Sequence, residues 1–396
     1  MKKRIVVITE YFYPSERNDA ILITKIVKTL TISNKVEVIC TSELEKKEEL
    51  EFLNGKVHRL KNFNIKSKNI ILRVLKLIYL TIQLIYKSIF FLKKDDRVFI
   101  VTNPVFLLPF MVFLKKIKNF EITLLVYDIF PENLIATNLL NKQNIIYKLL
   151  KKIYNWAYNN VDRLIVIGRD MQDFIQEKTN NKKEVFLIEN WCDYKKIVPM
   201  RKEENNIIKK FNLQDKIVFS FVGNFGLVQG IENLLSATTL VKNEQFVLLF
   251  IGDGGEKSKI ENFIKCNSKT NVIYAGKYPC IEENIFLNAC DVSVISLNDS
   301  MYGLGVPSKT YYNMAAEKPL LYIGHKNTEI ACMINNNNIG WVCESLNPEK
   351  LANLIDEICM EKDNFISFGK KSRDTLIKYY SEDIILNKYS GLYNDW

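Results

Sequence analysis

Short apolar runs alternate with longer helical stretches along the whole chain. In the first half, runs rich in β-branched and aromatic residues lie at 4–13, 35–41, 97–103, 121–128, 162–168 and 184–190. In the second half they lie at 217–224, 246–255, 271–277, 291–297, 319–324 and 339–344. Several runs are apolar at every position, as strands must be when helices cover both faces of a parallel sheet. The pattern predicts an α/β fold built of βαβ units.

A polar segment separates the two groups of strands. The stretch 190–212 is charged, contains Pro199 and has no sustained apolar period, which is typical of a hinge. A chain of 396 residues is also too long for one ordinary domain. We therefore expect two doubly wound, Rossmann-like domains over 1–195 and 196–380, followed by an amphipathic helix in 381–396 that crosses back to the first domain.

The stretch 69–94 is the most apolar part of the chain. Arg73, Lys76 and Lys87 interrupt it, and its longest uncharged piece, 77–86, is too short to span a bilayer. At helical spacing these cations form one polar stripe beside a wide surface of Leu, Ile, Tyr and Phe. Such a helix is typical of binding to an anionic membrane surface. A core helix whose lysines reach past their apolar neighbours to water is the alternative.

Positive charge is concentrated in the first half. Residues 1–200 hold 34 Lys/Arg and 21 Asp/Glu, whereas residues 201–396 hold 21 and 24. An anionic membrane, a phosphorylated lipid or nucleic acid would each complement that excess. The sequence lacks a recognisable platform of basic and aromatic residues, so we expect no nucleic-acid partner.

Cysteine and histidine usage argues against metal and triad chemistry. The eight cysteines form no Cys-x-x-Cys pair, and the N-terminus runs directly into a predicted strand without a signal-peptide pattern, so we expect a cytoplasmic protein. His58 and His325 are the two histidines, and neither lies near a metal-ligand spacing. We expect no metal site and no Ser-His-Asp triad.

Glycines follow three consecutive predicted strands of the second half. The loops after these strands contain Gly223, Asn224, Phe225, Gly252, Asp253, Gly276 and Lys277. Ligands of parallel α/β sheets bind at the carboxyl ends of strands, where small residues let backbone N–H groups approach a phosphate. The series predicts a nucleotide site; ordinary tight turns are the alternative.

A cationic helix start follows the fourth strand of this half. In LGVPSKTYYNMAAEKP (304–319), Pro307 fits a first helical turn, and Ser308 and Lys309 stand at the helix N-terminus. The exposed N–H groups and the helix dipole favour an anion there, and the Lys309 ammonium adds to that preference. The stretch predicts a diphosphate site.

Taken together, these motifs resemble a known family. The segments VGNFGLVQGIENLL, LLFIGDGGEKSKIE, NVIYAGK, ACDVSVISL and VPSKTYYNMAAEKP resemble family-4 glycosyltransferases in order and spacing. The similarity is greatest to the bacterial branch that transfers N-acetyl-L-fucosamine and related aminosugars in O-antigen and capsule assembly. EYFYPSERNDA (10–20) and VYDIFPENL (126–134) in the first half resemble the same branch. The resemblance implies a GT-B fold, with two Rossmann-like domains facing a cleft.

The resemblance also implies roles for individual residues. Gly223 and Asn224 would lie near the phosphates of a nucleotide-sugar donor, whose pocket Gly252, Asp253 and Gly276 would line. Lys309 would neutralise the leaving diphosphate. Most members carry two glutamates where this chain has Leu304 and Tyr312. The second of these usually contacts the ribose, so Tyr312 leaves that contact open.

The expected activity is sugar transfer with retention of configuration, without an enzyme nucleophile or metal. Asp128 and Glu132 are candidates for orienting or deprotonating the acceptor hydroxyl, with helix capping as the alternative. We expect a UDP-linked donor and no further cofactor. A lipid-linked or polysaccharide acceptor would meet the protein at the inner face of the plasma membrane. A nucleotide-sugar epimerase or hydrolase, or an inactive partner subunit, are the competing functions.

Overall fold

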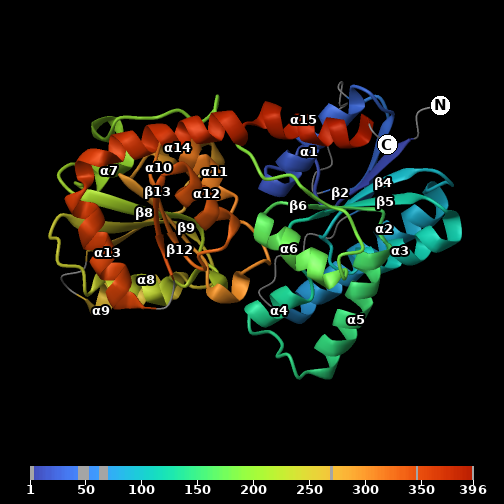
Figure 1. Ribbon diagram of the computed structural model, residues 1–396, viewed down its shortest axis with the longest axis horizontal. Helices are drawn as coiled ribbons and strands as arrows, with labels where there is room; N and C mark the ends of the chain where they lie inside the picture. Colours follow the sequence, from blue (N-terminus) through green and yellow to red (C-terminus); the bar gives the residue numbers. More distant parts are fainter. Residues whose placement is uncertain (1–3, 43–52, 62–69, 268–270, 345–346, 395–396) are drawn as a thin grey trace. The chain divides into compact units, whose positions relative to one another are not determined.

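The computed structural model describes residues 4–42, 53–61, 70–267, 271–344 and 347–394. The chain forms two compact units, each a parallel β-sheet with helices on both faces (Figure 1). The N-terminal unit comprises Met1–Ile167, Met171–Ile188 and the chain from Leu386 onward. The C-terminal unit comprises Gly168–Asp170 and Glu189–Ile385.

The sheet of the N-terminal unit has the order β3-β2-β1-β4-β5-β6-β7. Its strands are β1 (Ile5–Ile8), β2 (Val36–Ser42), β3 (Val57–Lys61), β4 (Arg97–Val101), β5 (Glu121–Val126), β6 (Arg163–Val166) and β7 (Val185–Leu187). The six strands expected in this half are all present. The seventh, β3, was not expected, because it is a half-exposed edge strand whose sequence VHRLK has little apolar character.

The helices of this unit are α1 (Asn18–Thr31), α2 (Ile70–Phe91), α3 (Leu107–Lys118), α4 (Glu132–Ala136), α5 (Ile145–Asn160) and α6 (Arg169–Lys178). The connections through α2, α3 and α5 all advance in one direction across the sheet, from β3 towards β6. Right-handed crossovers therefore put these three helices on the same face, as Figure 1 shows. The opposite step from β1 to β2 puts α1 on the other face.

The sheet of the C-terminal unit has the order β10-β9-β8-β11-β12-β13. Its strands are β8 (Ile217–Asn224), β9 (Phe246–Asp253), β10 (Val272–Gly276), β11 (Val292–Ser296), β12 (Leu320–Ile323) and β13 (Gly340–Cys343). All six correspond to the expected runs. The chain proceeds from β8 towards β10 and then continues from β11 towards β13, so its direction across the sheet reverses between β8 and β11.

The helices of the C-terminal unit bury two separate core clusters against its sheet (Figure 1). One face is covered by α8 (Ile231–Thr238), α9 (Lys257–Cys266) and α13 (Pro348–Met360). The other is covered by α7 (Asn206–Lys210), α10 (Glu283–Leu287), α11 (Lys309–Ala315), α12 (Glu329–Asn337) and α14 (Phe365–Tyr379). The last helix, α15, spans Glu382–Asn394.

Part of the segment 190–212 packs onto the C-terminal unit. Ile197, Ile207 and Ile208 are buried in a core cluster of the C-terminal unit. The Asn205 side chain caps the short helix α7 by accepting hydrogen bonds from the backbone N–H groups of Ile207 and Ile208. These isoleucines are too unevenly spaced to produce an apolar period, which is why the sequence pattern indicated only a polar linker.

Candidate functional site

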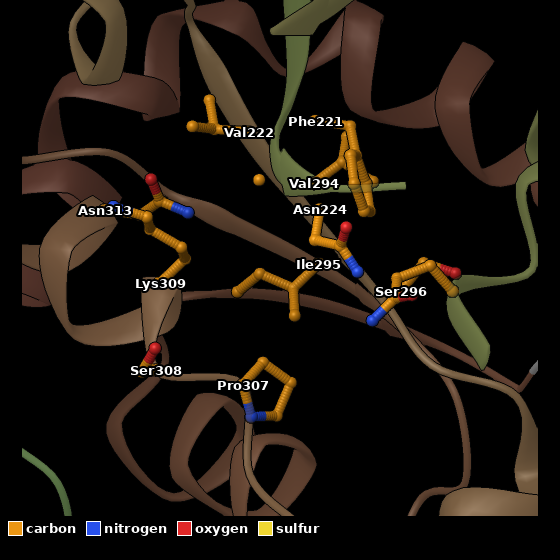
Figure 2. A pocket seen from close by; sticks show the side chains of 12 residues that line it. Phe221, Val222, Asn224, Val294, Ile295, Ser296, Pro307, Ser308, Lys309 and Asn313 are labelled. Atoms are coloured by element: carbon orange, nitrogen blue, oxygen red, sulfur yellow. The ribbon is translucent and has the colours of Figure 1, made fainter. Parts of the chain in front are cut away.

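A pocket of about 160 Å³ lies at the carboxyl ends of β8 and β11 in the C-terminal unit (Figure 2). Its lining residues are Phe221, Val222, Gly223, Asn224, Gln229, Val294, Ile295, Ser296, Pro307, Ser308, Lys309 and Asn313. The two strands are the neighbours between which the direction of the chain reverses. Ligands of open α/β sheets bind at such a switch point, because the loops diverge there and leave a crevice.

Gly223 and Gly252 are the penultimate residues of two paired strands, β8 and β9, and only Gly223 lines the pocket. Their φ angles are +142° and +146°, a region that residues with a Cβ rarely adopt. A Cβ on Gly252 would lie 1.9 Å from the Gly223 carbonyl oxygen. Gly252 therefore permits the close approach of the two strand ends, and Gly223 gives the pocket its open floor.

Phe225, Asp253 and Lys277 lie outside this pocket lining. Phe225 is fully buried, and its backbone N–H donates to the Asp253 carbonyl at 2.9 Å. The Asp253 carboxylate accepts a hydrogen bond from the next backbone N–H, that of Gly254, at 2.9 Å. Lys277 is exposed just after β10, and Gly276 ends that strand with φ +91° and open space where a Cβ would be. These residues shape and border the loops around the pocket.

Pro307, Ser308 and Lys309 form one wall of the pocket (Figure 2). Helix α11 begins at Lys309, Ser308 is its N-cap residue, and Pro307 precedes the cap. The helix thus starts two residues later than the proline-first pattern predicts. Lys309 and Ser308 nevertheless line the same pocket as Asn224.

The Lys309 ammonium is held by a carboxylate that the sequence analysis did not identify. Its Nζ lies 2.5 Å from Oε1 of Glu283, which is the first residue of α10. The same Nζ lies 4.6 Å from the ring centroid of Tyr312 and 5.7 Å from that of Phe286. Glu283 follows a turn of 3-10 helix, Cys280–Glu282, in a polar stretch without any motif. Only the fold brings it to Lys309.

Tyr312 and Asn313 are neighbours in α11 with different surroundings. Tyr312 packs against the core of the unit and is not among the residues that line the pocket. Burial raises the pKa of its phenol above the ordinary value. Asn313 is 2% exposed, lines the pocket, and has a buried Oδ1 without a hydrogen-bond partner among the described residues. A buried acceptor of this kind is costly unless a ligand or water satisfies it.

The pocket is suited to a small anion or to one part of a larger ligand. Lys309 supplies positive charge, and Asn224, Ser296 and Ser308 supply side chains able to donate hydrogen bonds. Its volume of about 160 Å³ is below the roughly 300–1,000 Å³ of sites that enclose a whole ligand. A ligand larger than a single small group would therefore extend beyond the pocket.

A larger hollow of about 720 Å³ lies elsewhere on the C-terminal unit. Lys216, Phe246 and Asn271 are among its lining residues, and they lie at or just before the starts of β8, β9 and β10. It therefore opens at the amino ends of the strands, opposite to the glycine-bearing ends. We do not assign the ligand site to it, because parallel sheets bind ligands at the carboxyl ends.

In the N-terminal unit, Asp128 follows β5 at the carboxyl edge of the sheet. Its backbone N–H lies 3.4 Å from Oγ1 of Thr102, and its side chain is accessible to solvent. The surrounding protein nevertheless removes part of its hydration, which raises the pKa of the Asp128 carboxyl above its ordinary value. Helix α4 has no side-chain cap, so Asp128 does not cap it.

Glu132 has contacts that differ from those of a base facing an acceptor. It is buried as the first residue of α4, and its Oε1 lies 2.5 Å from Nζ of Lys178. Burial lowers the pKa of Lys178, while the charge of Glu132 opposes that shift. A buried ion pair of this kind ties α4 to α6, and we interpret Glu132 as a structural residue.

Glu10 is a further buried carboxylate that the sequence analysis did not single out. It lies just beyond the end of β1 and is 6% exposed. Burial raises the pKa of its carboxyl, whereas a hydrogen bond from Tyr11 and the charges of Arg17 and Lys76 lower it. Lys76 therefore acts on the carboxyl edge of this sheet.

The outer surface of α2, α3 and α5 is unusually apolar. More than half of the exposed large apolar side chains of the described residues lie on these helices, among them Leu75, Ile82, Tyr86, Phe90, Phe110, Phe113, Ile117, Ile145, Ile146 and Leu149. We call this the three-helix apolar surface. Lys118 joins α3 to α2 by donating to the Leu92 carbonyl at 2.9 Å, and Lys116 lies 5.1 Å from the Trp156 ring of α5. The three helices therefore pack side by side, and each has exposed apolar side chains.

Helix α2 contributes the largest part of that surface. By length and composition its segment Val74–Phe91 could cross a membrane, the one such segment in the described part of the chain. Leu80 and Leu84, however, are buried within the N-terminal unit. Lys87 is half-buried over the Phe91 ring, and the side chain of Arg73 lies outside the described residues. Among the side chains that the structure describes on α2, α3 and α5, the exposed cations are Lys116 of α3 and Lys148, Lys151 and Lys152 of α5.

Comparison with known proteins agrees with this architecture. Residues 203–382 match the family model described as glycosyl transferases group 1. A probable glycosyltransferase of Pseudomonas aeruginosa, WbjE, is 42% identical over 299 residues, which cover 76% of this chain and 74% of that protein. A putative colanic acid biosynthesis glycosyl transferase of Escherichia coli, WcaI, is 24% identical over 45% of each chain.

Solved structures show the fold. Sucrose-phosphate synthase of Thermosynechococcus elongatus superposes with a TM-score of 0.74 at 15% identity, covering 100% of this chain and 99% of that one. HepE of Anabaena, solved with UDP and glucose, has a TM-score of 0.72 at 13% identity and covers 100% of both chains. The predicted GT-B fold is thereby confirmed. The identity to WbjE over most of both chains shows the family: this protein belongs to the group 1 glycosyltransferases.

Proposed function

We propose that the protein transfers a sugar, with an N-acetylated aminosugar as the candidate, from a nucleotide donor to a lipid-linked or polysaccharide acceptor with retention of configuration. The observation that carries the proposal is a lysine, Lys309, at a pocket on the switch point of the C-terminal sheet. Solved relatives of the same fold were crystallised with UDP or UDP-glucose. WcaI is named as a putative colanic acid biosynthesis glycosyl transferase, which supports a role in bacterial surface-glycan assembly.

The chemistry requires charge at the point where the diphosphate departs. The bond between the anomeric carbon and the phosphate oxygen breaks, and the acceptor oxygen bonds to the anomeric carbon on the same face. The acceptor proton passes to the leaving phosphate, so no enzyme nucleophile is required. Lys309 would stabilise the developing diphosphate charge, and Ser308 and Asn224 would orient it. The unsatisfied Oδ1 of Asn313 could accept a hydrogen bond from bound water or a donor hydroxyl.

Asp128 is the first-half residue that we propose for the acceptor. It lies at the carboxyl edge of its sheet, is accessible, and has a raised carboxyl pKa. These features suit a group that orients an acceptor hydroxyl. The buried ion pair of Glu132 with Lys178 makes Glu132 the weaker candidate.

We further propose that the three-helix apolar surface binds the cytoplasmic face of an anionic membrane. Exposed apolar areas of this extent mark contact surfaces. The exposed lysines of α3 and α5 would complement lipid phosphates. The buried side of α2 favours a helix lying at the interface over one that crosses the bilayer.

The deciding experiment is a thermal-shift panel of UDP-, GDP- and dTDP-linked sugars with the full chain. The stabilising donor is then incubated with a membrane extract that contains lipid-linked acceptors, with and without EDTA. We expect one nucleotide class to stabilise the protein and NMR to show a product with the donor's anomeric configuration. An inverted product would refute retention, and donor turnover without any acceptor would indicate an epimerase or hydrolase instead.

A further inference from the structure

Phosphate binding at Lys309 does not by itself explain why the carboxylate of Glu283 lies beside the same ammonium. Its carboxylate lies 2.5 Å from the Lys309 ammonium, the group to which the proposed function assigns the donor diphosphate. Two anions beside one cation repel each other, so a carboxylate at a diphosphate site raises the cost of binding. Hydrogen-bond donors on the ligand can offset that cost, because they stabilise the carboxylate after its cation has turned to the phosphate.

The topology shows on which side of Lys309 this carboxylate lies. Helix α10 connects the edge strand β10 to β11, and α11 connects β11 to β12, both on the same face of the sheet. Glu283 therefore approaches Lys309 from the side of β9 and β10. Strands β9 and β10, which carry Gly252 and Gly276 near their carboxyl ends, border the space into which the nucleoside would extend under the proposed function. Glu283 is not among the residues that line the pocket, so a ligand held at Lys309 would meet it only where that ligand extends beyond the pocket on this side.

The group that follows the diphosphate in a nucleotide sugar is the ribose. Its two neighbouring hydroxyls are donors, and a carboxylate has two oxygens to accept from them. Hydrogen bonds to a charged acceptor are stronger than those between neutral groups. Tyr312 cannot fill this role, because a phenol offers one donor and the ring packs against the core. The carboxylate that α11 lacks is thus available from α10.

We propose that Glu283 binds the ribose hydroxyls of the donor and thereby selects ribonucleotide sugars over deoxyribonucleotide sugars. The inference rests on the proposed function and narrows its substrate class. UDP- or GDP-linked sugars carry both hydroxyls, whereas dTDP-linked sugars lack the 2′-hydroxyl. In the free protein, Glu283 holds Lys309 in place, and on donor binding each group exchanges its partner for part of the ligand.

The test compares UDP with 2′-deoxy-UDP and 3′-deoxy-UDP by calorimetry on the full chain, with the guanosine series used if the panel selects GDP. We expect the wild type to bind the ribonucleotide about tenfold more tightly than either deoxy form, as the loss of one charge-assisted hydrogen bond implies. Glu283→Gln should reduce that preference to near unity. Glu282→Gln, at the preceding acidic position, is the matched control and should keep it.

Three outcomes would overturn the inference while leaving the proposed function intact. The wild type could bind all three nucleotides equally, or Glu283→Gln could leave the preference unchanged. Glu283→Gln could also tighten every nucleotide alike, which would make Glu283 only a competitor of phosphate for Lys309. Failure of the wild type to bind any nucleotide of the panel would instead count against the proposed function itself.

Discussion

The two units share an architecture and differ in where their unusual residues lie. In the C-terminal unit, helices on both sheet faces bury their apolar side chains in two core clusters, and exposed apolar residues such as Leu240, Ile281 and Met360 are scattered. In the N-terminal unit, the exposed apolar residues gather on α2, α3 and α5. A parallel sheet requires covering helices, but it does not require their outer faces to be apolar.

The difference indicates that the two units, although they share a fold, suit different kinds of ligand. The N-terminal unit exposes apolar and basic side chains to solvent, which favours a large partner that is both apolar and anionic. The C-terminal unit turns a lysine and an unsatisfied asparagine oxygen inward to a small pocket, which favours a compact anionic ligand.

The largest expected effect on stability concerns the buried ion pair between Glu132 and Lys178 in the N-terminal unit. Glu132→Ala leaves the Lys178 ammonium buried and unpaired, so we expect the free energy of unfolding to fall by about 3–5 kcal/mol. Urea denaturation followed by circular dichroism measures the loss. The double variant Glu132→Leu with Lys178→Met should recover most of it. A stable Glu132→Ala protein with no transferase activity would restore Glu132 as a candidate catalytic residue.

In the C-terminal unit the corresponding test removes the pocket cation. Lys309→Ala should lower turnover on the order of a hundredfold, because a positioned charge no longer meets the developing diphosphate. The melting temperature should change little, since the Lys309 side chain is partly exposed. Lys326→Ala, which removes an exposed lysine of the same unit, is the control and should retain full turnover. Activity of Lys309→Ala within a few-fold of wild type would move the diphosphate site elsewhere.

The outward surface can be tested without any substrate. Phe113→Glu should weaken binding to anionic vesicles about tenfold or more, since burial of a large apolar side chain contributes roughly 1.5–3 kcal/mol. Sedimentation with vesicles containing phosphatidylglycerol measures the partition, which should also weaken as salt screens the lysines. Ile281→Glu, a change to an isolated exposed apolar residue of the other unit, should have no effect. Equal binding of wild type to neutral vesicles would reject the electrostatic part of the proposal.

The smallest expected effect concerns Asp128. Because its folded pKa is raised, the folded state binds more protons than the unfolded state between the ordinary and the raised pKa, and stability declines as pH rises through that window. Asp128→Asn removes this penalty, so the variant should be slightly more stable than wild type at neutral pH while transferring sugar more slowly. Thermal melts at pH 4 and pH 7 measure the difference. A variant that loses stability at neutral pH would assign Asp128 to the scaffold.

The sequence was informative where physical constraints act locally. Twelve of the strands follow from apolar runs, because a strand covered on both faces must be apolar throughout. The edge strand β3 was not predicted, because an edge strand is partly exposed and its residues include the charged Arg59 and Lys61. The burial of isoleucines in the segment 190–212 was not predicted for a related reason: they belong to a core that other, distant segments define.

The pocket residues, too, could be predicted from the sequence only where the constraint on them is local. Gly223, Ser308 and Lys309 belong to motifs at strand ends and could be identified from the chain alone. Glu283 could not be identified in this way, because its contact with Lys309 depends on the crossover from β10 to β11, which contains α10. Asn313 lies inside a recognised motif, but its buried Oδ1 becomes notable only when the surrounding side chains are in place.

The turn that precedes Glu283 also provides a site for attaching a fluorescent dye. Cys280 is exposed in it, and Cys266 is the other fully exposed thiol of the described residues. A Cys266→Ser protein would offer one ready position for a maleimide dye a few residues from Glu283. Such a conjugate could report donor binding by a change in fluorescence, which would allow nucleotide sugars to be screened before any acceptor is known.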